Sequence, residues 1–76
     1  MNPTETQKLH VNMLAMFASM HMTPTAANKL AYLEGLRESM LEGPISLLNY
    51  EYMAAIDAEI TILSLQLILA HVRRTL

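Results

Sequence analysis

The sequence predicts a small all-α protein, with one domain spanning residues 1–76. Apolar residues recur at spacings of three and four along most of the chain, and no segment has the strict alternation of a half-buried strand. Pro24 and Pro44 stand in two breaks between the periodic segments. The pattern favours either a helical hairpin or a three-helix protein with a long C-terminal helix. The predicted helices cover about residues 3–21, 24–42 and 47–75.

The first predicted helix begins with a capping pattern. Asn2 is the expected N-cap, Pro3 takes the first helical position, and Glu5 is expected to return a hydrogen bond to the cap. Methionine dominates the apolar stripe of this helix, and its flexible thioether side chain suits adaptable binding surfaces as well as cores. We expect this stripe either to contact a partner or to brace the rest of the chain. Its methionines are Met13, Met16 and Met20.

The second predicted helix has a start signal and a stop signal. Thr23 and Pro24 take the cap and first helical positions, and Gly43 followed by Pro44 ends the helix. The helix has a single apolar stripe, which predicts one packed face. The residues of this stripe that are assigned to the core are Leu30, Leu33 and Met40.

The third predicted helix has two apolar stripes on opposite sides. At 100° per residue the stripes lie about 180° apart, and polar seams separate them. One stripe is expected to pack on the rest of the chain, and the other is expected to meet a partner. The core stripe is Ile56, Ile60, Leu63 and Leu67. The partner stripe is Ala58, Ile62, Leu65, Leu69, Val72 and Leu76.

Composition favours a protein that is buried in a complex. The chain is 53% hydrophobic and 16% charged, more apolar and less charged than soluble domains with about 25% charged residues. A chain of 76 residues buries only about 60% of its unfolded surface, so its own core is small. The apolar excess indicates an obligate partner or, when the chain is alone, a homo-oligomer. The alternative is a closed bundle in which the first two helices each cover one side of the third.

Catalytic, metal-binding and nucleic-acid-binding functions find no support in the residue pattern. There are no cysteines, and His10, His21 and His71 lack the spacing of metal ligands. Asp57 and Glu59 point to different sides of their helix, which makes them a poor acid–base pair. The net charge of −2 and the five Lys or Arg residues argue against a nucleic-acid partner. We therefore predict no enzyme activity, no catalytic residue, no metal and no cofactor.

A membrane-spanning segment is not predicted either. The apolar run from Ile60 to Val72 is shorter than the roughly 20 residues that a spanning helix needs, and Ser64, Gln66 and His71 interrupt it. Near the N-terminus, polar residues break up the apolar stretch and no small-residue cleavage site follows, unlike in a signal peptide. The expected location is therefore cytoplasmic.

The order of features between residues 26 and 72 resembles that of a known family. A helix with the pattern Leu33-x-x-Leu36-Arg37-x-x-Met40-Leu41-x-Gly43 is followed by a short connection, by Asn49-Tyr50, and by a long helix with Ala58-Glu59-x-Thr61-Ile62. This order is similar to that of the YscE/PscE/EscE family of small type III secretion co-chaperones. The resemblance implies a helical hairpin that binds a tetratricopeptide-like co-chaperone in the bacterial cytosol. Through that partner it keeps a needle subunit soluble.

Two other functions are alternatives to the co-chaperone. In a self-associating helical regulator or phage-type adaptor, the second stripe of the third helix would pair with its own copy by two-fold symmetry. A small membrane-active protein is the third alternative. The co-chaperone and the self-associating regulator both depend on which stripe of the third helix faces outward.

Overall fold

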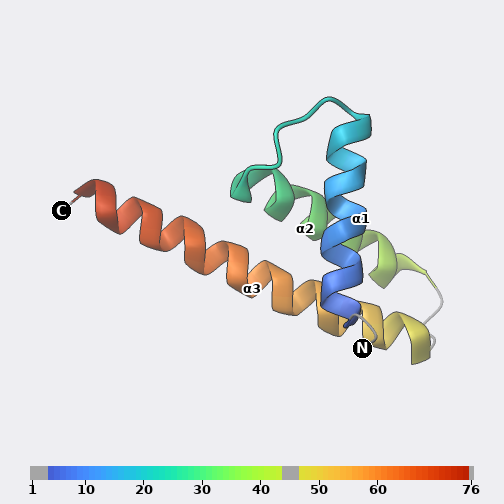
Figure 1. Ribbon diagram of the computed structural model, residues 1–76. Helices are drawn as coiled ribbons and strands as arrows, with labels where there is room; N and C mark the ends of the chain where they lie inside the picture. The colour runs from blue at the N-terminus through green and yellow to red at the C-terminus, as the bar shows by residue number, and fades with distance from the viewer. Residues whose placement is uncertain (1–3, 44–46, 76) are drawn as a thin grey trace.

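The protein consists of three helices in a computed structural model that describes residues 4–43 and 47–75. The helices are α1 (Glu5–Ser19), α2 (Ala26–Glu42) and α3 (Leu47–Thr75). No strand occurs in the described residues, so the predicted all-α class is confirmed. Figure 1 shows α2 and α3 running in opposite directions as a hairpin, with α1 crossing the first half of α3 at a steep angle.

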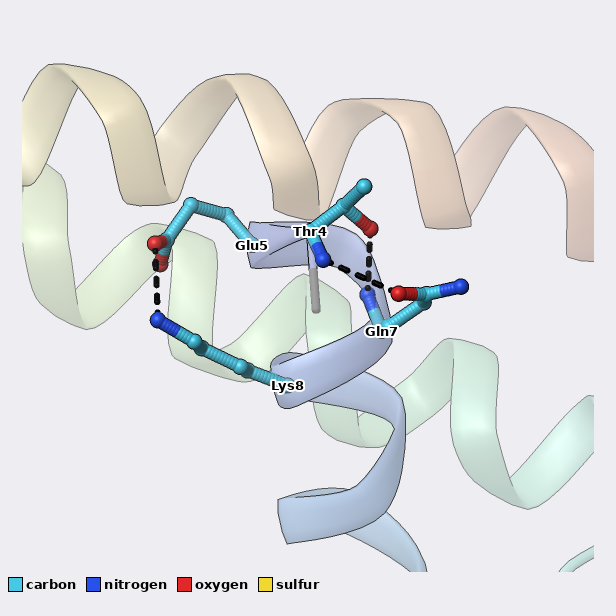
Figure 2. Close-up of polar contacts among 4 residues, drawn as sticks. All are labelled: Thr4, Glu5, Gln7 and Lys8. Carbon is cyan, nitrogen blue, oxygen red and sulfur yellow. Dashed lines mark hydrogen bonds and ion pairs between the residues drawn. The ribbon is translucent and has the colours of Figure 1, made fainter. Parts of the chain in front are cut away.

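A reciprocal pair of hydrogen bonds fixes the start of α1. The Thr4 hydroxyl accepts from the Gln7 backbone N–H at 3.1 Å, and the Gln7 side-chain carbonyl accepts from the Thr4 N–H at 2.9 Å (Figure 2). Lys8 Nζ lies 3.4 Å from Glu5 Oε1 on the same turn. Thr4 has the extended backbone of an N-cap, so two of the N–H groups that a helix leaves without partners at its start are satisfied.

These caps correct both predicted helix starts. Because α1 begins at Glu5, this residue does not return a hydrogen bond to the cap, and the expected cap positions Asn2 and Pro3 lie outside the described residues. Helix α2 begins after Thr25, whose hydroxyl accepts a hydrogen bond from the backbone N–H three residues later. Thr23 instead accepts the Thr25 N–H with its backbone carbonyl, at 2.9 Å. In each place two capping side chains stand two residues apart, and the later one is the cap.

A residue in the left-handed backbone region ends α1. His21 has a φ of 55°, its N–H donates to the Ala18 carbonyl at 3.2 Å, and the Met22 N–H donates to the Phe17 carbonyl at 2.9 Å. This pair of bonds is a Schellman cap, which satisfies carbonyls of the last helical turn. The last helical residue is therefore Ser19 and not residue 21.

The hydrophobic core takes side chains from all three helices. Its buried members are Leu9, Met13 and Phe17 of α1, Leu33 of α2, and Ala55, Ile56 and Leu63 of α3. The Phe17 ring meets the Tyr32 ring edge-on, with centroids 5.9 Å apart. This ring pair brings α1 against α2, in addition to the packing of each on α3.

The residues assigned to the core by their periodicity lie on the packed sides of α2 and α3. Those that are buried are Leu33, Ile56 and Leu63. Those that are partly buried against the same cluster are Leu30, Met40 and Ile60. Leu67, one turn beyond Leu63, is partly buried. The stripe formed by Ile56, Ile60, Leu63 and Leu67 is called the inner stripe below, because its first part faces α1 and α2.

Helices α1 and α2 cover neighbouring surfaces of α3 and not opposite ones. Tyr52 of α3 lines an open groove with Gln7 of α1, whereas Asp57 and Ile60 line a groove with Arg37 of α2. Arg37 Nε donates to Asp57 Oδ1 at 2.8 Å, and because both side chains are about half exposed the pair contributes at most about 1 kcal/mol. The closed bundle with both stripes of α3 covered is therefore not formed.

Candidate functional site: an exposed apolar face on helix α3

The second half of α3 extends beyond the other two helices. Figure 1 shows its orange-to-red part projecting away from α1 and α2. Among the described residues from Ser64 to Thr75 none is buried, although Ser64, Leu67 and Ala70 are partly buried. Helix length gives the reason, because the 17 residues of α2 span about 26 Å and the 29 residues of α3 span about 44 Å. Helix α2 is too short to follow α3 to its end.

Five large apolar side chains, from Ile62 onward, form one exposed face on α3. They are between 43% and 57% exposed, and their spacing places them on one side of the helix. We call this surface the outer face, and its residues are Ile62, Leu65, Ile68, Leu69 and Val72. Ala58 is exposed on the same side, one turn earlier. The outer face leaves several hundred Å² of contiguous apolar surface, a size typical of an interaction site.

The outer face contains most of the stripe that the sequence assigns to a partner, and one residue that was missed. Four members of the predicted stripe are exposed on it, and Leu76 lies outside the described residues. Ile68 was not assigned, because at 100° per residue it lies at the edge of the stripe, beside the seam that holds Ser64 and His71. The unbroken apolar run from Leu67 to Ala70 is the sequence signal that could have included it.

The methionine stripe of α1 does not join the outer face. Met13 is 1% exposed and belongs to the core, so its assignment to a partner surface was wrong. The steep crossing of α1 over α3 buries this position, which periodicity alone does not reveal. Met16 and Met20 are exposed, but they lie toward the end of α1 that Figure 1 shows directed away from α3. Met13 therefore braces the fold, and the other two form a separate surface.

Charges lie at the two ends of the outer face and not within it. Between residues 60 and 72 the sequence has no Asp, Glu, Lys or Arg. Asp57, which bonds to Arg37, and the mostly buried Glu59 precede the outer face, whereas Arg73 and Arg74 occupy the last turn of α3. A partner that covers the outer face would thus meet an uncharged surface that ends at the basic last turn of α3.

Other parts of the described chain offer little for chemistry. No group of three or more His, Asp or Glu side chains that could hold a metal ion occurs among residues 4–43 and 47–75. The groove between α1 and α3 is lined mainly by Lys8, Val11 and Tyr52, and it is open to solvent. The groove between α2 and α3 surrounds the ion pair of Arg37 and Asp57. Glu34 and Glu38 line the second groove as well.

Helix α3 is also long and apolar enough, over Tyr50–Thr75, to cross a membrane. The residue pattern predicts no span, because the apolar run is short and polar residues interrupt it. Length and composition alone are weak evidence for a span, since core helices of soluble proteins pass the same test. Only 22% of the most apolar window is buried in the structure, so this helix differs from a typical core helix in having much of its apolar surface uncovered.

No protein-family model, no curated protein and no solved structure matches the chain. The features of the chain that bear on its function are the outer face and the order of helical motifs in the sequence.

Proposed function

We propose that the protein is a non-enzymatic binding module that docks the outer face of α3 into a groove of a helical partner. The observation that carries the proposal is the set of five half-exposed Leu, Ile and Val side chains on one side of a projecting helix. An amphipathic helix laid into an apolar groove is a recurrent mode of protein recognition, in which side chains at three- and four-residue spacing are the anchors.

The five anchors of the outer face supply only part of the free energy that a tight complex needs. Full burial of a Leu, Ile or Val side chain contributes about 1.5 to 3 kcal/mol, so covering the exposed half of each contributes about 1 kcal/mol. Together the five contributions only offset the free energy that is lost when two proteins associate, so tight binding needs further contacts. The partner is therefore expected to reach beyond the five anchors, for example to the exposed sides of Leu67 and Ala70.

The core of the protein leaves the outer face free to serve this function. Ile56 and Leu63 are buried against α1 and α2, and at 100° per residue they lie about 100° to 140° around α3 from Ile62 and Leu69. A partner can thus approach the outer face without displacing any core side chain. The fold acts as a base that holds one end of α3 and presents the other end.

We assign the partner to the tetratricopeptide-like class, and with it the role of a type III secretion co-chaperone in the bacterial cytosol. Two lines support this. The order of motifs between residues 26 and 72 resembles that co-chaperone family, and stacked helical repeats have the extended concave surfaces that accept a helix. The bound pair would keep a needle subunit soluble.

The test is recovery of the partner by an affinity-tagged chain, co-expressed with the products of neighbouring genes. Wild type is expected to retain a tetratricopeptide-like protein at both low and high salt, because apolar anchors are insensitive to screening. The Leu65→Glu, Leu69→Glu double variant should lose it. The matched control is Leu41→Glu on α2, which changes a leucine with the same 54% exposure as Leu65 and Leu69. Recovery that ignores the double variant, or that disappears in salt, would contradict the proposal.

A further inference from the structure

We infer that in the absence of its partner the outer face is covered by a second copy of the chain, with the two α3 helices antiparallel. The inference rests on the proposed function in one respect, since it uses the same outer face as the docking site. It adds the occupant of that site in the free protein, and it makes pairing and partner binding mutually exclusive. The spacing of the outer face supports this arrangement, the basic last turn of α3 favours its direction, and the area of the outer face limits its strength.

Spacing sets the register of the pair. From Ala58 the exposed residues on this side follow at steps of four, three, four and three, which is the alternation of a two-stranded coiled coil. In an antiparallel pair the two kinds of core position face each other. Leu65 then packs on Leu69 of the second copy, and Ile62 packs on Val72 of the second copy. Every core layer formed by the outer face contains two large apolar side chains.

The position of Ile68 supports the same register. This residue lies at the edge of the outer face, where a coiled-coil pair has its flanking positions. With Leu65 on Leu69 of the second copy, Ile68 lies beside Ile68 of the second copy near the two-fold axis. An apolar contact across the axis would cover this side chain, which at 57% is the most exposed of the outer face.

Charge favours the antiparallel direction over the parallel one. A parallel pair would place the last turns of both α3 helices together, with Arg73 and Arg74 of each copy beside those of the other. It would also align the two helix dipoles. The antiparallel pair separates the two basic last turns, which removes this repulsion. The α1 and α2 helices of the two copies also lie at opposite ends.

Area limits how tightly the two copies hold each other. A standard stable interface covers about 800 Å² on each partner. The outer face provides several hundred Å² per copy, so the pair is expected to dissociate in the micromolar range and to give way to a partner with a larger groove. A second copy can therefore cover the outer face and still be displaced by the partner.

The absence of cysteines allows a direct test by disulfide cross-linking. Leu65→Cys and Leu69→Cys are prepared as separate chains, one of them tagged so that the mixed product is distinguishable on a non-reducing gel. The antiparallel pair predicts a cross-linked product from the mixture, several-fold above that from either variant alone. Ile62→Cys mixed with Val72→Cys should behave in the same way. Leu41→Cys, on α2 with the same exposure as Leu65, is the control, and circular dichroism verifies that each variant is folded.

Every outcome of the cross-linking test either supports or overturns the inference. Cross-linking of each single variant with itself would show a parallel pair and overturn the inference. Product no higher than that of the control would overturn it too, and co-sedimentation of the chain with phosphatidylglycerol vesicles would then assign the outer face to a lipid surface. The proposed function fails by a separate measurement, which is loss of partner recovery by the wild type. A chain that recovers its partner but does not cross-link keeps the function and loses the second copy.

Discussion

The parts of α3 before and after the boundary between Leu63 and Ser64, called its first and second halves here, have opposite surroundings. In the first half, Ala55, Ile56 and Leu63 are buried by α1 and α2. In the second half no described residue is buried. The difference comes from the reach of the neighbouring helices and not from the residues themselves, because α2 is about 18 Å shorter than α3. Apolarity thus predicts that a surface will be covered, but not by what.

The comparison separates two uses of the same residue type. Leu63 and Leu65 stand two positions apart on one helix, yet the first is a core residue and the second belongs to the outer face. Substitutions at such pairs test whether the two halves of α3 have distinct roles. If both halves gave the same response, the distinction between core and binding surface would be lost.

The largest expected effect is on stability, from the first half of α3. Ile56→Ala removes a side chain that is 0% exposed and should lower the free energy of unfolding by about 2 to 5 kcal/mol. Leu69→Ala, in the second half, should lower it by less than about 1 kcal/mol, because this side chain is already half exposed. Urea denaturation followed by circular dichroism measures both. Equal losses would show that the second half is also part of a core.

The next effect is on association, from the second half. Leu65→Glu places a charge in the outer face and should weaken self-association more than tenfold, while helicity stays near that of the wild type. Sedimentation equilibrium at micromolar concentration gives the mass, and circular dichroism gives the helicity. Leu41→Glu should leave the mass unchanged. A wild-type chain that is monomeric throughout the micromolar range would contradict this prediction, because there would be no self-association to weaken.

A smaller effect is expected from the cap that begins α1. Thr4→Ala removes the hydroxyl that accepts the Gln7 N–H and should cost about 1 kcal/mol of stability. Because α1 covers only the first half of α3, partner recovery through the outer face should persist in this variant. Thermal unfolding and partner capture are measured together. Thr4→Ser, which keeps the hydroxyl, is the control, and it should restore most of the loss.

The smallest expected effect is a gain in stability. Gly35 lies within α2, and a Cβ added there would meet no atom within 4 Å. Gly35→Ala should therefore raise the free energy of unfolding by about 0.5 to 1 kcal/mol through helix propensity alone. Self-association should not change, since α2 does not contribute to the outer face. A loss of stability would show that a neighbour comes closer to Gly35 than the structure indicates.

The helical class and the exposed stripe of α3 could be predicted from the sequence, because both follow from local periodicity. The stop of α2 at Glu42 and Gly43 agrees with the residue pattern for the same reason. The burial of Ala55 and Glu59 beside the inner stripe could not be predicted, because it depends on where the other helices pack on α3. The position of Met13 in the core could not be predicted, since it depends on where α1 crosses α3. The choice of Thr4 and Thr25 as caps depends on hydrogen bonds that compete with those of nearby capping residues. Periodicity predicts two similar stripes on α3. It does not reveal that α2 is too short to cover the end of this helix.

The hairpin of α2 and α3 has a consequence for the speed of folding. These two helices follow each other closely in the chain and pack along each other, so much of the core forms from contacts that are short in sequence. Helical proteins with such local contacts fold within microseconds to milliseconds. Ribosomal synthesis, at about 5 to 20 residues each second, is far slower than this, so the hairpin forms as soon as α3 has left the ribosome. Any partner of the outer face would therefore meet a folded surface and not a nascent chain.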